Sequence, residues 1–121
     1  AQALVQSQLR SAGSVQFSAC GYAGLGAPFD VVINATSASL FGELPPLPAS
    51  VFAPGCLAYE MVYGKGATPF LQLARSAGVQ HLADGVGMLV EQAAEAFAWW
   101  RGVRPETSEA IAQLNVPIVW P

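Results

Sequence analysis

The stretch Asp30-Val31-Val32-Ile33-Asn34-Ala35-Thr36 decides the fold class of this 121-residue sequence. Its first half is a nearly continuous run of apolar, β-branched residues. A run of this kind, without the alternation of a half-exposed strand, is typical of a central strand buried on both faces of a parallel sheet. The segment 30–36 therefore predicts such a strand, with its carboxyl end at Thr36.

The residues that follow predict a loop, a second strand and a helix. Ser37 to Pro54 contains four prolines and predicts a long loop, which in compact domains is usually functional. Cys56 to Met61 predicts a strand. A helix then begins after Thr68, a residue suited to capping its first turn, with Pro69 in the first helical position, and ends at Gly78.

The last third of the sequence predicts a short strand and two helices. Val79 to Leu82 is the strand, and Met88 to Arg101 is a long helix with Gly102 as its stop. Pro105 opens a final helix that runs to about Leu114, and the tail 115–121 has no usable periodicity.

Before residue 30 the pattern predicts a helix over Ala1–Arg10 and a strand over Val15–Cys20. The glycine-rich segment 21–26 suggests a phosphate-binding loop, but such loops lead from a strand into a helix. Here Pro28 and another predicted strand follow, so we interpret the segment as a connection.

The predicted order of elements is helix, strand, strand, strand, helix, strand, helix, helix, which indicates an α/β protein with a doubly wound parallel sheet. We expect one structural unit over residues 1–121.

Composition excludes several classes of protein. The sequence is 53% hydrophobic and 11% charged, with a net charge of -3, which argues against disorder and against a nucleic-acid partner. No apolar run approaches the roughly 20 residues that span a membrane, and no secretion signal is recognisable, so we expect a cytoplasmic protein with reduced cysteines.

Two cysteines and one histidine do not make a metal site. The high apolar content suggests a surface that meets another domain or subunit.

Four segments, in this order and spacing, resemble the shikimate dehydrogenase family over roughly residues 30 to 114. They are Asn34-Ala35-Thr36-Ser37, Tyr59-Glu60-Met61-Val62-Tyr63, Gly64-Lys65-Gly66-Ala67-Thr68-Pro69-Phe70, and Asp84-Gly85-Val86-Gly87-Met88-Leu89-Val90-Glu91-Gln92-Ala93-Ala94. The segment Trp100-Arg101-Gly102-Val103 also fits the helix end usual in the family. A single motif of this kind would be weak, but four in register are specific.

The resemblance implies a partial Rossmann-like sheet, namely the carboxyl-terminal part of an NADP-binding domain with closing helices over about 88–114. It implies the reduction of 3-dehydroshikimate to shikimate in aromatic amino acid biosynthesis. The catalytic lysine–aspartate pair of the family belongs to an amino-terminal substrate domain that these residues do not resemble. We therefore expect no catalytic residue here, and no activity of these residues alone.

The same resemblance implies which residues contact ligands. The nicotinamide cofactor would meet residues near three predicted strand ends, and the substrate would meet two polar side chains across the cleft. The cofactor residues are Thr36, Ser37, Met61 and Gly85; the substrate residues are Tyr63 and Gln92.

Each of these assignments has a structural alternative. Met61 can be core filler, and the Gln92 amide can bond a backbone carbonyl as readily as a ligand hydroxyl. Lys65 is better interpreted as an exposed turn residue than as a catalytic lysine. Asp84 is better interpreted as a charge favoured by the dipole of the following helix than as a general acid. His81 is given no role.

The sequence departs from the family pattern at two positions. Glu60 stands where aspartate is usual, and Ser39 where glycine is usual; a serine would be strained there if φ were positive. We expect neither change to touch the ligands directly.

Other interpretations of the sequence stay open. One is a non-catalytic interaction or assembly module, and another is a relative that acts on quinate as well as shikimate. The absence of two strands that normally lie beside 30–36 leaves an apolar sheet edge. Another chain could supply those strands, a homo-oligomer could form at the edge, or strand 15–20 could pair there.

Overall fold

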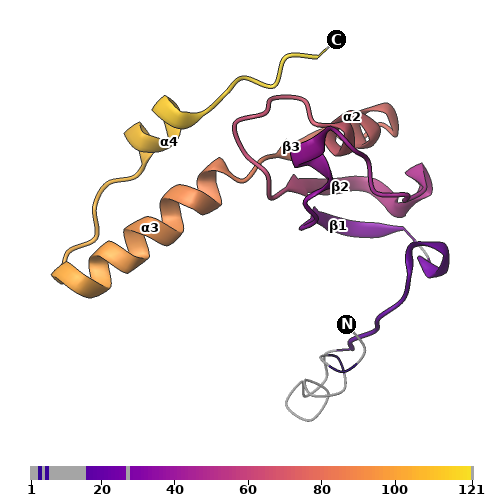
Figure 1. Cartoon of the computed structure of the whole chain (residues 1–121), viewed down its shortest axis with the longest axis horizontal. Coiled ribbons are helices and arrows are strands. Elements are labelled where there is room, and N and C mark those ends of the chain that lie inside the picture. The colour runs from indigo at the N-terminus through magenta and orange to yellow at the C-terminus, as the bar shows by residue number, and fades with distance from the viewer. Residues whose placement is uncertain (1–2, 4, 6–15, 27, 121) are drawn as a thin grey trace.

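The computed structural model describes residues 3, 5, 16–26 and 28–120 and has an open, parallel, three-stranded sheet in the order β1-β2-β3. The strands are β1 (Phe29–Asn34), β2 (Phe52–Glu60) and β3 (His81–Ala83). All three run in the same direction, so their carboxyl ends meet at one edge (Figure 1). The predicted α/β class with a parallel sheet is confirmed.

One short 3₁₀ segment precedes β1, and two more lie in the loop that joins β1 to β2. Helix α2 (Pro69–Ser76) joins β2 to β3. The 3₁₀ segments are η1 (Tyr22–Gly24), η2 (Ala38–Phe41) and η3 (Ala49–Val51). Because η1 is followed by β1 and not by an α-helix, the glycine-rich segment 21–26 is a connection, as predicted.

Helix α2 (Pro69–Ser76) covers one face of the sheet and forms the core with it (Figure 1). The Oγ1 atom of Thr68 accepts a hydrogen bond of 3.4 Å from Leu71 N, which is the predicted cap. The helix ends before Gly78, whose φ of 90° favours glycine. The core consists of eight buried residues from β2, α2 and their connections: Val51, Phe52, Cys56, Ala58, Phe70, Leu71, Ala74 and Val79.

Helices α3 (Val86–Arg101) and α4 (Ser108–Leu114) form a separate pair that projects away from the sheet (Figure 1). Gly102 ends α3 with a φ of 72°, as the sequence predicted. Only Val86 and Ala94 of α3 are buried, and the large side chains of Phe97, Trp99 and Trp100 are exposed. None of the helices in the described part of the chain is long and apolar enough to cross a membrane.

The carboxyl-terminal tail returns to α2, which the sequence did not predict. Ile118 and Trp120 are partly buried against the core. The guanidinium carbon of Arg75 lies 4.2 Å from the centre of the Trp120 ring, a cation–π contact that joins the tail to α2.

Two predictions about the sheet are wrong. Strand β1 is an edge strand and is not buried on both faces: Val31 and Ile33 are 52% and 58% exposed. Residues 16–20 form no strand, and Cys20 is exposed although Cys56 is buried as predicted. Two neighbours are missing among the described residues: none covers the face of β1 that carries Val31 and Ile33, and none pairs with the outer edge of β1. The predicted helix over Ala1–Arg10 lies almost wholly outside the described residues, as does Val15.

Candidate functional site

The candidate site lies at the carboxyl edge of the sheet. Thr36 follows the end of β1 by two residues, Met61 follows β2 directly, and Gly85 follows β3 by two. The Met61 amide donates a hydrogen bond of 3.0 Å to the carbonyl of Asn34, which ties the ends of β1 and β2 together. In open parallel sheets this edge is where ligands bind.

The backbone of Gly85 lies very close to the backbone of Met61. A Cβ atom built on it would lie 2.1 Å from the carbonyl oxygen of Met61 and 2.9 Å from the carbonyl carbon. Real Cβ atoms do not come so close to a backbone, so only glycine lets the start of α3 pack on the end of β2. This requirement holds before any ligand is considered.

A buried carboxylate lies directly beneath this edge. The side chain of Glu60, the last residue of β2, is fully buried. Its Oε2 accepts hydrogen bonds from Asn34 Nδ2 at 3.0 Å, from Ser39 Oγ at 2.6 Å and from Thr68 Oγ1 at 3.0 Å. Its Oε1 accepts one from Val62 N at 3.2 Å. Every partner donates, so the buried group is satisfied as an acceptor on both oxygens.

The network continues from Glu60 to the first predicted cofactor residue. Asn34 Oδ1 accepts bonds from Thr36 N at 3.1 Å and from Thr36 Oγ1 at 2.8 Å. Thr36 Oγ1 in turn accepts a bond of 3.3 Å from the Ala38 amide. The turn that follows β1 is therefore built around the side chain of Asn34.

This network was missed by the sequence analysis, which treated Glu60 and Ser39 as two separate departures from the family pattern. The structure joins them by a hydrogen bond. Ser39 is not strained, because no non-glycine residue in the described chain has a positive φ. The available signal was the placement of Asn34 and Glu60, each a polar residue at the end of an apolar strand.

The structure gives the remaining site residues varied surroundings. Thr36 and Ser37 are exposed, Met61 is partly buried, and Tyr63 is 47% exposed. Gln92 is exposed and donates a bond of 3.1 Å from Nε2 to the Leu89 carbonyl, which is the alternative partner considered for it. All six residues lie in the turns after the strands or in the first half of α3.

The residues interpreted as structural behave accordingly. Asp84 Oδ1 accepts a bond of 3.1 Å from Val86 N at the start of α3, whereas its Oδ2 is buried without a partner among the described residues. Lys65 and His81 are exposed. The described residues contain no cluster of side chains that could hold a metal ion.

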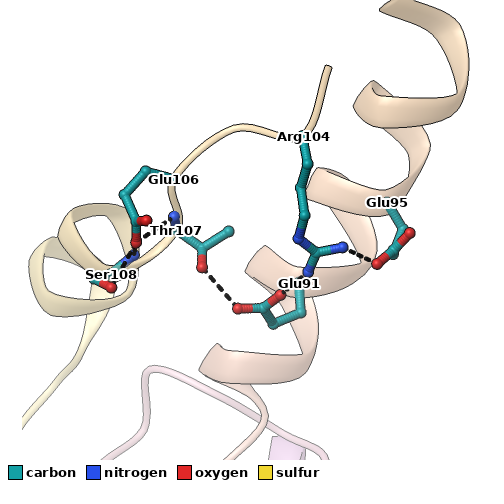
Figure 2. A network of polar contacts seen from close by, with 6 residues as sticks. All are labelled: Glu91, Glu95, Arg104, Glu106, Thr107 and Ser108. Atoms are coloured by element: carbon teal, nitrogen blue, oxygen red, sulfur yellow. Dashed lines mark hydrogen bonds and ion pairs between the residues drawn. The ribbon is translucent and has the colours of Figure 1, made fainter. Parts of the chain in front are cut away.

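A second polar network joins α3 to α4 (Figure 2). Arg104 pairs with Glu91 at 2.5 Å and with Glu95, and Thr107 Oγ1 donates to Glu91 at 2.7 Å. These side chains are half exposed, so the network orients α4 along α3 and adds little stability.

Helix α4 begins at Ser108 and not at the predicted Pro105, and the Glu106 carboxylate lies against its first residues. Its Oε1 accepts hydrogen bonds from Ser108 Oγ at 2.6 Å, Ser108 N at 3.0 Å and Thr107 N at 3.1 Å (Figure 2). These bonds, that of the Ser108 hydroxyl first, lower the pKa of Glu106.

The chemistry available at the carboxyl edge suits binding. The side chains of Thr36, Ser37 and Met61 offer two hydroxyls and a thioether, and Gly85 offers backbone alone. None of the four is a general base at neutral pH. The geometry thus defines an α/β protein of the kind that binds a ligand across the ends of parallel strands.

Comparison with known proteins gives this class a family. The sequence model of the family described as "Shikimate 5'-dehydrogenase C-terminal domain" matches residues 85–114. The shikimate dehydrogenase (NADP(+)) of Dechloromonas aromatica is 63% identical over 94 residues, which are 78% of this chain and 34% of that protein. The chain thus spans about a third of the length of the curated relatives that it matches.

Solved structures agree. An Ael1 enzyme from Pseudomonas putida is 64% identical with a TM-score of 0.75, over 81% of this chain and 36% of that one. Shikimate 5-dehydrogenase from Thermus thermophilus, in complex with NADP(H) and shikimate, is 32% identical with a TM-score of 0.59, over 70% and 34% of the two chains. The chain belongs to the shikimate dehydrogenase family and corresponds to its carboxyl-terminal region.

Proposed function

We propose that this chain forms the nicotinamide side of the active site of an NADP-dependent shikimate dehydrogenase. The reaction is hydride transfer between NADPH and 3-dehydroshikimate, which gives shikimate. The cofactor supplies the hydride when it is bound, and the residues of this chain hold and orient it. The observation that carries the proposal is the convergence of Thr36, Met61 and Gly85 at one edge of a parallel sheet.

The donor set of the edge fits a nicotinamide group. The thioether of Met61 offers a polarisable apolar surface suited to an aromatic ring. Gly85 is buried and its carbonyl accepts from Leu89 N at 2.9 Å, so it contributes the absence of a side chain, whereas Thr36 and Ser37 offer exposed hydroxyls. The described residues contain no Gly-x-Gly-x-x-Gly/Ala segment that leads into a helix, and we assign this chain to the nicotinamide side of the cofactor.

The substrate side is assigned to Tyr63 and Gln92, which are exposed and can reach a polar ligand. Gln92 already uses one donor on Leu89, but its amide keeps a second donor and a carbonyl acceptor for a hydroxyl or carboxylate. The proton-transfer group comes from an amino-terminal substrate domain that these residues do not resemble. Reduced cysteines agree with a cytoplasmic location, which is part of the proposal.

The test uses a full-length chimera in which this chain takes the place of the matching segment of the Dechloromonas aromatica enzyme. We expect Gln92→Ala to raise KM for shikimate and to lower kcat with little change in KM for NADP, because a polar ligand contact is worth on the order of 1–3 kcal/mol. Met61→Ala should instead raise KM for NADP.

The matched control is Gln113→Ala, an exposed glutamine on α4 outside the site. If the shikimate constants of Gln92→Ala equal those of the unvaried chimera, then Gln92 serves only its contact with Leu89.

A further inference from the structure

Ser39 stands at the far end of the turn that carries Thr36 and Ser37. The turn comprises residues 35–37, between the end of β1 at Asn34 and the start of η2 at Ala38. Its residues are exposed, whereas Asn34 and Ser39 on either side are 4% and 5% exposed. The exposed turn thus has two buried anchors.

Both anchors bind the same atom. Asn34 Nδ2 and Ser39 Oγ lie 3.0 Å and 2.6 Å from Glu60 Oε2, and 3.3 Å from each other. The Ser39 bond has the length of a charge-assisted bond from a hydroxyl to a carboxylate, which is stronger than a bond between neutral groups. One buried carboxylate therefore closes the turn at both ends.

The same carboxylate also holds the neighbouring part of the site. Its Oε1 accepts from the Val62 amide, directly after Met61, and Thr68 donates to its Oε2 from the cap of α2. Loss of the Ser39 hydroxyl would release the far end of the turn, while the Asn34, Val62 and Thr68 contacts with Glu60 stay in place. The substrate residues Tyr63 and Gln92 have no hydrogen bond to this network among the described contacts.

We propose that Ser39 is a positioning residue for cofactor binding, whose bond to the Glu60 carboxylate fixes the turn 35–37 against the dinucleotide. The inference rests on the proposed function and deepens it. It also makes Glu60 and Ser39 a coupled pair. The Glu60 side chain, longer than the aspartate usual in the family, accepts a hydrogen bond from the Ser39 hydroxyl on η2.

The experiment measures steady-state kinetics and thermal unfolding of the full-length chimera and its Ser39→Ala variant. We expect KM for NADP to rise about tenfold, since a hydrogen bond to a charged group is lost, with KM for shikimate and kcat changed less than about twofold. The control is Ser76→Ala, an exposed serine at the end of α2, which should change none of these constants.

A double-mutant cycle with Glu60→Gln tests the coupling. In that background Ser39→Ala should raise KM for NADP by less than it does alone, because the carboxylate through which Ser39 acts is gone. Full additivity overturns the coupling, and if Glu60→Gln does not fold, the single variant still decides the positioning role.

An unchanged KM for NADP in Ser39→Ala, with or without a lower melting temperature, shows that Ser39 is only structural and leaves the proposed function standing. A folded but inactive unvaried chimera overturns the proposed function and the role of Ser39 with it.

Discussion

At the scale of single residues, the site depends on how closely two backbones approach. The position of Gly85 over the Met61 carbonyl leaves no room for even a methyl group. The family resemblance implies a ligand contact for Gly85, and the structure adds a packing requirement that needs no ligand.

We expect Gly85→Ala to destabilise the full-length chimera by about 3 kcal/mol, because the start of α3 must move away from β2. Gly87→Ala is the matched control: no atom lies within 4 Å of its added methyl, and alanine favours a helix. Urea unfolding of both variants measures the difference. Equal stability of the two variants would show that the contact at Gly85 relaxes without cost.

The sequence predicted local features of residues better than their long-range partners. The cap at Thr68 and the stop at Gly102 follow from rules that involve only a few neighbouring residues. The bonds of Glu60 join residues that are 21 and 26 positions apart, so no local pattern reveals them. The turn residues after β1 were assigned to the cofactor only through the family resemblance, and that assignment stays a prediction.

At the scale of elements, α4 owes its start to Glu106 and not to a capping residue at Thr107, which makes no side-chain cap bond. Since the pKa of Glu106 is lowered in the folded chain, its contribution is complete above the ordinary pKa of glutamate. The contribution is lost as the pH falls through the lowered value, when the carboxylate takes up a proton.

We predict that Ser108→Ala raises the pKa of Glu106 toward its ordinary value, because the first cause of its lowering is removed. A carbon NMR titration of the Glu106 carboxyl, with Ser50→Ala as an exposed control, measures the change. A pKa that is the same in both variants would mean that the backbone amides of Thr107 and Ser108 are sufficient.

The sequence predicted the order of the described elements but not the environment of β1. A run of β-branched residues indicates a strand whose two faces are covered by other parts of a protein. The pattern does not say whether the residues that cover those faces belong to the same chain or to another one. The described residues leave β1 at the edge, and the same absence of a neighbour explains why residues 16–20 are not a strand.

At the scale of the whole molecule, the outer side of β1 is apolar and open. A hollow of about 240 Å³ beside it is lined mostly by apolar side chains, among them Phe29, Val31 and Leu47. An unpaired apolar strand at an edge readily pairs with another chain. Pairing of β1 with residues 16–20 was one of the alternatives that the sequence left open, and it is absent from the structure.

We therefore predict that the isolated chain self-associates through β1 in sedimentation velocity, whereas Val31→Lys shifts it toward the monomer. Val103→Lys, at an exposed valine after α3, is the control and should not change the distribution. A monodisperse monomer of the unvaried chain at high concentration would show that the open edge is tolerated.

The most direct measurement is the rate of NADP reduction by shikimate, compared between the full-length chimera and the isolated 121-residue chain. We predict turnover by the chimera and none above an enzyme-free blank by the chain alone, because the residues that we propose to hold the nicotinamide include no proton-transfer group. A folded chimera that does not oxidise shikimate, or an isolated chain of verified mass that does, would contradict this assignment.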